Sequence, residues 1–522
     1  MTSPKTLIGH PAGLFVLFFT EMWERFSYYG MRAILVLFLV STASEGGFNW
    51  SRADALTLYG IYTGLVYLTP IFGGILADKF WGFRKAVVIG AGLMTAGHAA
   101  MAFETEFTFY LGLALLVLGN GAFKPNISSM VGQLYPEGSG KKDSAYTIFY
   151  MGINAGAFLG ILICGYLGEQ VGWSYGFGAA GIFMLFGLLQ FQFAQKLFGS
   201  IGEKPQKSTE HDSLDAEIVQ EAQIDLDPMD KTPAKIERDR LIVIGVLAFF
   251  TIFFWMAFEQ AGGTMTVFAA DYTDRSLDTD LAVNSFRWIS FAFTIIPIVI
   301  LSIVLFGLAK QLFAQYPLTI IFTLLSFLII WGVMVFINKS NFESDTLEVP
   351  ASWFSTLNSF FIISLAPLFS KLWERLAKNG GGPSGPVKFA IGLILLGLGF
   401  GALSFGAAPI EQGAQTASVS MIWLCLAYFL HTLGELCVSP VGLSFVNKLS
   451  PKRLLGMMFG IWFLANFVAN TLAGISGSFI DRISEASSLS GFFSIFLFSS
   501  IGAALILLIL NKKLVRMMHG VN

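Results

Sequence analysis

The chain has 522 residues, of which 55% are hydrophobic and only 13% are charged, and its net charge is −2. Soluble domains carry about 25% charged residues, so this composition excludes a soluble enzyme, a disordered chain and a disulfide scaffold, and it gives no reason to expect nucleic acid as a partner. The cysteines lie in apolar runs without metal-ligand spacing, and we interpret them as core residues: Cys164, Cys425 and Cys437. No cofactor or metal is expected.

Apolar runs of about 17–25 residues, long enough to cross a bilayer, recur along the chain. They are continuous rather than alternating, which favours helices over a β-barrel. The sequence therefore predicts an all-α membrane protein with about fourteen transmembrane helices, at 13–40, 54–77, 86–103, 108–133, 145–168, 174–197, 240–266, 287–309, 317–337, 353–376, 387–407, 420–447, 453–475 and 490–511.

The first run is too long for a signal peptide and carries charges in its middle. A charge in mid-span costs about 2.5–3.5 kcal/mol, so such residues should face a cavity and carry function. Helical geometry puts Glu21, Arg25, Tyr28 and Arg32 on one face, which we expect to look into a polar cleft, with neighbours Glu24 and Tyr29 beside it. A structural ion-pair network that locks neighbouring helices is the alternative.

Few other polar residues lie inside spans, and they are Lys124, Asn154, Glu259, Asn358, His431 and Glu435. Pro125 predicts a kink beside Lys124. The direction of each span puts Arg32 and Glu259 in outer halves, and puts Lys124 and Glu435 near the midplane. We therefore predict two gate pairs between the halves, Arg32–Glu259 outside and Lys124–Glu435 inside, because protonating either carboxylate strands its partner.

Residues 198–240 are polar and interrupt the apolar pattern. They predict an N-terminal six-helix bundle at 1–197, an acidic cytoplasmic linker at 198–239 and a C-terminal bundle at 240–522. Eight spans follow the linker, so a core of six plus six leaves one accessory hairpin. The apolar runs within 287–337 fit a lipid-facing hairpin best.

Lysines and arginines gather in alternate loops, which the positive-inside rule assigns to the cytoplasm together with both termini. We expect the membrane to be a cell membrane, and a bacterial inner membrane in particular. The basic residues are Lys79, Arg84, Lys85, Lys141, Lys142, Lys371, Arg375, Lys378, Lys388, Lys448, Lys452, Arg453, Lys512, Lys513 and Arg516.

Four segments carry recognisable motifs. They are 21–30 (E-x-x-E-R-F-x-Y-Y-G), 73–85 (GGILADKFWGFRK), 149–157 (FYMGINAGA) and 433–442 (LGELCVSPVG). Together they resemble the signatures of the proton-dependent oligopeptide transporter family of the major facilitator superfamily. The 73–85 motif alone indicates only the superfamily.

The resemblance implies a major facilitator fold with an accessory hairpin, no enzyme activity, and a symporter that imports di- and tripeptides with protons. It places proton coupling on Glu21, Glu24, Arg25 and Glu259. It places the peptide carboxylate near Arg32 and Lys124, and the peptide amino group near Glu435. The remaining ligand contacts that it implies are Asn154 and Asn358 on the peptide backbone, and Tyr28, Tyr29, Tyr67, Trp255, Ser439 and Trp462 in pockets.

Two departures from the family pattern stand out. Animal members carry a histidine in the second span before a Y-L-T-P stretch, here 67–70, and the matching residue is Gly60. The hairpin of bacterial relatives usually precedes the seventh core helix. Here it follows, because 255–260 (WMAFEQ) already carries the pattern of that helix.

Other functions suit the same pattern less well. Nitrate, another small anion or an amino acid fits the fold, but Glu435 argues for a ligand ammonium. An intramembrane hydrolase needs a nucleophile, and none lies at helical spacing from His431 and Glu435, the one mid-span His–acid pair in the sequence. A passive channel conflicts with the inferred pairs of gates.

Overall fold

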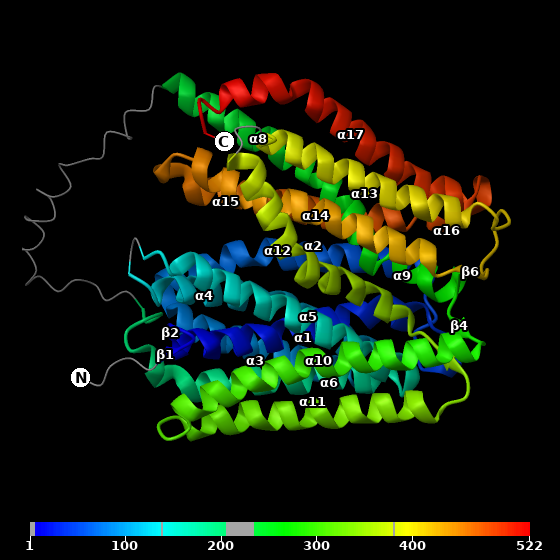
Figure 1. The fold of residues 1–522 in the computed structure, drawn as a ribbon, viewed down its shortest axis with the longest axis horizontal. Coiled ribbons are helices and arrows are strands. Elements are labelled where there is room, and N and C mark those ends of the chain that lie inside the picture. The colour runs from blue at the N-terminus through cyan, green and yellow to red at the C-terminus, as the bar shows by residue number, and fades with distance from the viewer. Residues whose placement is uncertain (1–5, 137–138, 205–233, 379–381, 522) are drawn as a thin grey trace, which may run out of the picture.

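The computed structural model describes residues 6–136, 139–204, 234–378 and 382–521. These residues are almost wholly helical, and the long helices run along one axis (Figure 1). Both chain termini lie at one end of this axis, which we call the terminal end, and the opposite end is the distal end. The predicted linker residues 205–233 lie outside the described residues.

Six helices form the N-terminal half. They are α1 (Ala12–Val40), α2 (Arg52–Leu76), α3 (Phe83–Met101), α4 (Glu106–Gln133), α5 (Lys142–Gln170) and α6 (Trp173–Ala194). α1 packs against α5 and α6, and α3 packs against α4. Almost every residue of α1 is buried, including Glu21, Glu24 and Arg25, whereas Arg32 is partly exposed. α4 continues unbroken across Pro125.

The C-terminal half contains α8 (Ala234–Phe258), α12 (Thr356–Lys378), α13 (Gly385–Ala407), α14 (Ile422–Leu449), α15 (Leu455–Gly477), α16 (Ile480–Ala486) and α17 (Leu489–Met517). α13 packs against α14 and α17, and α8 packs against α15 and α17. This half forms the upper layer in Figure 1.

The two halves meet where α2 packs against α15 and where α5 packs against α12. Gly60 on α2 faces Gly474 on α15, and a Cβ atom at Gly60 would lie 2.5 Å from the Cα atom of Gly474 and 2.7 Å from its nitrogen. No side chain fits there without moving backbone. This contact gives a packing reason for glycine at the position where animal members carry histidine.

The predicted hairpin is formed by α10 (Asp280–Leu312) and α11 (Pro317–Glu343). It follows α8 in the chain, yet α11 packs on α6 of the N-terminal half, at the bottom of Figure 1. The Thr323 hydroxyl donates to Gln190, and the ring of Phe327 packs edge-on against Phe19 and Trp23. Many apolar side chains of both helices are exposed, as a lipid-facing pair requires.

Twelve helices of the described chain are long and apolar enough to cross a membrane, whereas the sequence predicted about fourteen. The predicted spans outside this set are α1 and α3. Hydropathy alone does not mark α1 because it carries Glu21, Glu24, Arg25 and Arg32.

Most helices extend beyond the predicted apolar runs, because a helix can continue through polar turns that hydropathy does not count. α8 begins at Ala234, six residues before the predicted start at 240, and its first turn carries Glu237, which pairs with Arg453. The predicted span 240–266 is not one continuous helix. α8 ends at Phe258, and a 3-10 turn (Glu259–Gly262), α9 (Thr264–Val267) and a π turn (Phe268–Tyr272) follow. Gly263 makes the break, with φ −115° and ψ −101°.

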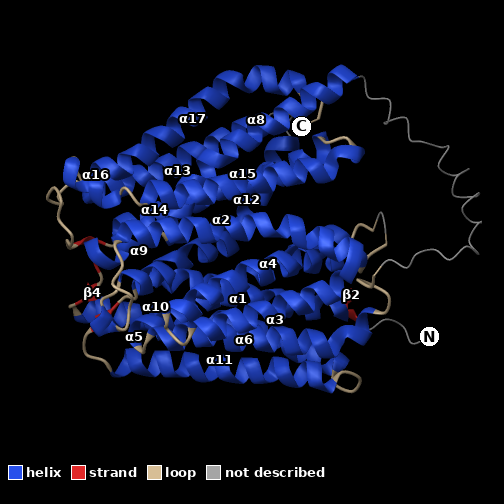
Figure 2. Ribbon diagram, turned by 180° about the vertical axis from the view of Figure 1, so that it is seen from behind, coloured by secondary structure: helices blue, strands red, loops and turns tan. Residues whose placement is uncertain are grey.

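Short strands pair only at the two ends of the described molecule (Figure 2). At the terminal end β1 (Thr6–Leu7) pairs with β2 (His10–Pro11). At the distal end β3 (Thr273–Asp274) pairs with β6 (Val419–Ser420), and β4 (Ser276–Leu277) pairs with β5 (Leu347–Glu348). The remaining turns are η1 (Ala43–Glu45), a π turn (Ala77–Trp81), η3 (Gln195–Phe198), η7 (Ala351–Ser355) and η8 (Lys452–Leu454).

Candidate functional site

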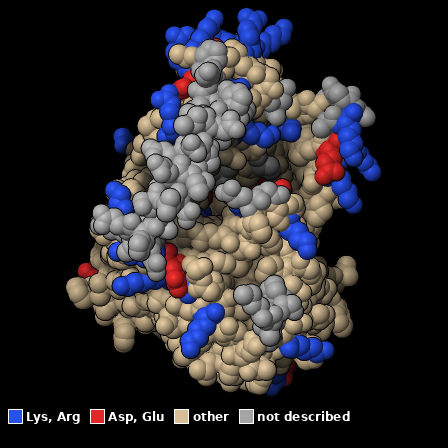
Figure 3. Space-filling model, turned by 90° about the vertical axis from the view of Figure 1, so that its left-hand side faces the viewer, with Lys and Arg blue, Asp and Glu red and all other residues tan. Residues whose placement is uncertain are grey.

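Two adjoining cavities lie between the halves. The central cavity has a volume of about 270 Å³ and the second, towards the terminal end, about 690 Å³. Tyr67, Trp255 and Ser439 line both, so the two spaces form one path. Figure 3 looks onto the terminal end, where Lys and Arg side chains stand around a hollow between the halves.

The acidic pair of α1 is held by its own arginine. Arg25 donates to both carboxylate oxygens of Glu24, and its Nε atom lies 3.2 Å from Glu21. Asn120 on α4 donates to Glu24 at 3.0 Å. All three charged side chains are 3% exposed or less and none lines either cavity, so this part of the predicted face does not look into a cleft. Asn120, the α4 partner of the cluster, is one helical turn from Lys124.

Two arginines of α1 contact its tyrosines. The Arg25 guanidinium lies 5.3 Å from the ring centroid of Tyr28 and 6.0 Å from that of Tyr29, and Arg32 lies 5.9 Å from Tyr29. Tyr29 lines the central cavity. Tyr28, which the resemblance placed in a pocket, is buried behind it and is not among the described residues that line either cavity.

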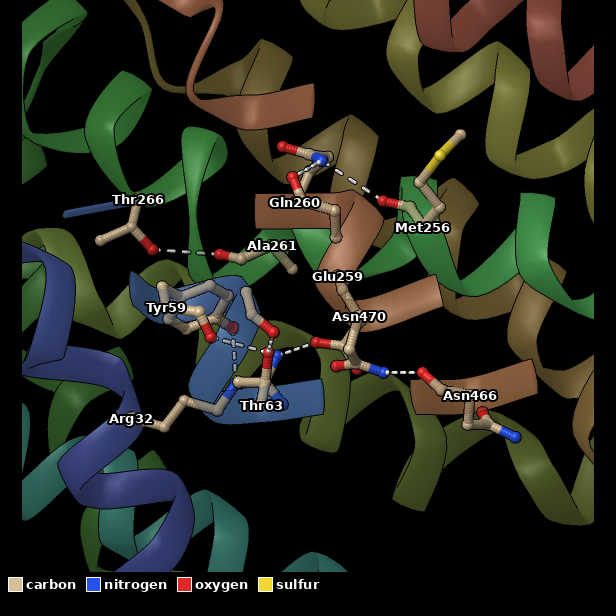
Figure 4. A network of polar contacts seen from close by, with 12 residues as sticks. Arg32, Tyr59, Thr63, Met256, Glu259, Gln260, Ala261, Thr266, Asn466 and Asn470 are labelled. Atoms are coloured by element: carbon tan, nitrogen blue, oxygen red, sulfur yellow. Dashed lines mark hydrogen bonds and ion pairs between the residues drawn. The ribbon is translucent and has the colours of Figure 1, made fainter. Parts of the chain in front are cut away.

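Arg32 and Glu259 form an ion pair at the distal side of the central cavity (Figure 4). Their side chains are 11% and 4% exposed. Arg32 also donates to the Tyr59 hydroxyl at 2.6 Å. Glu259 stands at the break after α8, where Gly262 lets Tyr59 approach, because a Cβ atom at Gly262 would meet the Tyr59 hydroxyl. The helix break and the ion pair therefore both close the distal side of the central cavity.

A second ionic cluster closes the distal end and was not predicted from the sequence. Arg52, the first residue of α2, lies 2.7 Å from Asp271 and 2.9 Å from Asp481 of the C-terminal half. It also donates to Tyr272 and Gln415. These residues stand at the ends of helices, where charged side chains are ordinary, so hydropathy gave no signal for them.

Towards the terminal end, the charged residues have partners within their own halves. The Lys124 ammonium lies 4.8 Å from the ring centroid of Tyr67, both in the N-terminal half. Glu435 accepts a hydrogen bond from Asn358 at 2.9 Å, both in the C-terminal half. No ion pair joins Lys124 to Glu435 in the part of the chain that the structure describes. The predicted outer pair is in contact in this state, and the predicted inner pair is apart.

The remaining predicted ligand residues stand around the same path. Asn154 lines the central cavity and donates to the Tyr150 carbonyl of its own helix. Trp255 and Ser439 line both cavities, and Trp462 lines the one at the terminal end. Within the described ranges no group of three or more His, Cys, Asp or Glu residues is arranged to hold a metal.

The path formed by the two cavities carries opposite charges. Lys124, from the N-terminal half, lines the cavity at the terminal end, and Glu435, from the C-terminal half, lines the central cavity, together with amide side chains and aromatic rings. This arrangement suits a small ligand with a carboxylate at one end and an ammonium at the other.

Known transporter sequences are similar to this chain over almost its whole length. The POT family profile matches residues 84–210 and 309–495. The chain is 36% identical to the "Uncharacterized transporter YclF" of Bacillus subtilis, with 99% of this chain and 97% of that one covered. It is 32% identical to a "Di-/tripeptide transporter" of Lactococcus lactis subsp. cremoris, with 99% and 98% covered.

Solved structures give the same result for the fold. A crystal structure of a peptide transporter POT in complex with alafosfalin matches with a TM-score of 0.75 at 31% identity and covers 99% of this chain and 97% of that chain. A POT family transporter in complex with 5-aminolevulinic acid matches with a TM-score of 0.74 at 26% identity, covering 98% of each chain.

Proposed function

Because this chain belongs to the POT family, a family of multi-span membrane transporters, we propose that it carries di- and tripeptides across a bacterial cell membrane. The observation that supports this ligand class best is the presence of opposite charges in two adjoining cavities, Lys124 in the one at the terminal end and Glu435 in the central one. A zwitterionic peptide has a carboxylate that Lys124 attracts and an ammonium that Glu435 attracts. Asn154 and Asn358 line the central cavity and offer hydrogen bonds to peptide amides.

Arg32 takes a different part from Lys124 in this proposal. Its guanidinium is already paired with Glu259, so Lys124 meets the carboxylate first while the distal end is closed. A peptide that reaches Arg32 competes with Glu259 for the same guanidinium. Binding of the carboxylate and closure of the distal end are therefore coupled through one residue.

Proton coupling is assigned to two places. Glu259 is one, because a proton on its carboxylate removes the partner of Arg32 and frees the distal side. The Glu21–Glu24–Arg25 cluster is the other, and it accepts a hydrogen bond from Asn120, which is one helical turn of α4 from Lys124. Arg32–Glu259 and Lys124–Glu435 then act as alternating gates.

The topology of the proposal puts the terminal end in the cytoplasm, with both termini there. The basic rim around the hollow at this end supports that orientation (Figure 3). Fourteen spans follow if α1 and α3 cross with the other twelve. The bundles are then 1–197 and 240–522, joined by the linker 198–239, with 287–337 as the accessory hairpin.

Uptake into proteoliposomes with and without an imposed pH gradient tests the function. A labelled dipeptide should accumulate only with an acidic exterior, and excess unlabelled dipeptide should compete. Uptake that does not depend on the pH gradient would indicate facilitated diffusion rather than proton symport. A second candidate, transport of an amino acid, is favoured by the 5-aminolevulinic acid complex of a similar protein. That ligand should displace the dipeptide if the second candidate holds, and nitrate should displace neither.

A further inference from the structure

Glu169, at the distal end of α5, joins the two halves on the side of the cavity away from Arg52. Its carboxylate accepts hydrogen bonds from the amide N–H groups of Ala351 at 2.7 Å and Ser352 at 2.9 Å, and from the Ser352 hydroxyl at 2.5 Å. Glu169 has no basic partner within ion-pair distance among the described residues. A carboxylate of the N-terminal half thus caps the 3-10 turn η7 of the C-terminal half, a turn that has no side-chain cap of its own.

The last turns of α5 form a socket for this segment. A Cβ atom at Gly165, one turn before Glu169, would collide with the side chain of Ser352. The Trp353 indole donates to the Leu162 carbonyl at 3.1 Å, and its ring packs against Tyr166. Close approach, a buried donor and the carboxylate cap all act on residues 351–353.

η7 is the point where the chain returns from the N-terminal half. The hairpin α10–α11 packs on α6, and after β5 the chain enters η7 and continues directly as α12. Arg275 also holds this crossing, through Glu348 and the Val349 carbonyl, both at 2.7 Å. The carboxylate of Glu169 therefore acts where a segment attached to one half becomes a helix of the other.

The start of α12 also forms a wall of the central cavity. Ser355, Asn358 and Ser359 line it from this side, and Asn154 and Ala157 of α5 line it as well. The distance between these walls depends on how η7 is docked on α5.

We propose that Glu169 is a positioning residue that holds the start of α12 on α5. In this role it sets the position of Asn358 for the ligand and keeps the distal mouth closed on this side. Hydrogen bonds to a charged acceptor are stronger than neutral ones, so three of them hold η7 firmly. The part of this inference that concerns the ligand rests on the proposed function, but the docking of η7 does not.

Hydrogen–deuterium exchange of the full-length protein tests the docking directly. The variants are Glu169→Gln and Glu169→Ala, with Glu106→Gln as the matched control, because Glu106 is an exposed carboxylate in the first turn of α4 at the same end. We expect amides in 345–356 to exchange about tenfold faster in both Glu169 variants and unchanged in the control. Ser352→Ala removes only the hydroxyl donor and should give a smaller increase.

Ligand binding supplies the second readout. In equilibrium exchange of a labelled dipeptide, Glu169→Gln should raise KM several-fold while the rate at saturation is largely kept, a split that general unfolding would not give. Unchanged exchange of 345–356 in Glu169→Gln and Ser352→Ala, both mild enough to fold, would overturn the proposal. If the wild-type chain moves no peptide, the proposed function fails, whereas the amide exchange still decides the role of Glu169.

Discussion

The distal and terminal ends of the cavity differ in where their charged groups find partners. At the distal end, Arg32 pairs with Glu259 and Arg52 pairs with Asp271, and both pairs cross between the halves. At the terminal end, Lys124 lies on Tyr67 and Glu435 is held by Asn358, each within its own half. The structure is therefore closed distally and open terminally.

This difference shows how one end can open at little cost. Separating the terminal ends leaves neither charge of the expected inner pair alone, because each half supplies a substitute partner. Separating the distal ends breaks the contact between Arg32 and Glu259. Arg32 keeps Tyr59 of its own half, whereas Glu259 loses the one side-chain partner that it has among the described residues. A shift of about 5.5 kcal/mol moves a population from 1:99 to 99:1. Loss of one partner of a buried pair costs about 3–5 kcal/mol, so in the proposed mechanism a proton on Glu259 would supply most of such a shift.

The largest expected effect comes from Glu259→Gln, which breaks the closed end of this comparison. Removing one partner of a buried pair costs about 3–5 kcal/mol, and a carboxamide cannot carry a proton through the cycle. We expect accumulation driven by a pH gradient to be abolished while dipeptide exchange between equal pools persists. Glu106→Gln is the control, and wild-type accumulation by Glu259→Gln would remove the coupling role.

Gly60→Ala should act on the same end by sterics alone. Its Cβ atom would meet the backbone of Gly474, and overpacking of this kind costs about 1–3 kcal/mol in the closed form only. Gly92→Ala is the matched control, because a Cβ atom at Gly92 on α3 has nothing within 4 Å. Spin labels at the exposed residues Tyr175 and Glu411, at the distal ends of opposite halves, should report a longer distance in Gly60→Ala. Equal distances in both variants would show that the α2–α15 contact adapts.

Arg52→Gln should give a smaller opening of the distal end. Arg52 is 12% exposed, but Asp271 and Asp481 are 28% and 30% exposed, so water screens the cluster and its worth is about 1 kcal/mol. That corresponds to about a fivefold change in the ratio of closed to open forms, and high salt should reduce the difference from wild type. The exposed Arg482 at the same end gives the control variant Arg482→Gln. A salt-independent effect as large as that of Glu259→Gln would mean that water does not screen the ion pairs of Arg52.

The sequence predicted the fold more completely than the candidate functional site. Long apolar runs and the polar break at 198–240 marked the helices and the two halves. Of the charged face predicted for α1, only Arg32 lines a cavity, because the acids Glu21 and Glu24 pair with Arg25 inside the N-terminal half. Residues at helix ends were missed, because Arg52, Glu169 and Asp481 stand where charged side chains are common and only their three-dimensional partners distinguish them. The break at Gly262–Gly263 was missed because hydropathy averages over the whole apolar run.

Deletion of the hairpin α10–α11 should have the smallest effect on transport. It tests whether the closed distal end and the open terminal end depend only on the other helices. Deleting 287–337 removes the hydrogen bond from Thr323 to Gln190 and the ring contact between Phe327 and Trp23. The deletion therefore exposes part of α6 and α1. We expect the thermal midpoint to fall by several degrees, since about 1 kcal/mol shifts it by some 2–4 °C in domains of 150–250 residues. Dipeptide exchange should stay within about twofold of wild type, because none of the deleted residues lines either cavity and a twofold change corresponds to less than 0.5 kcal/mol. Thr323→Val, which removes one hydrogen bond and keeps the helix, separates stability from transport. A folded deletion that binds no peptide would assign the hairpin to the core, because η7 and the crossing to α12 would then depend on it.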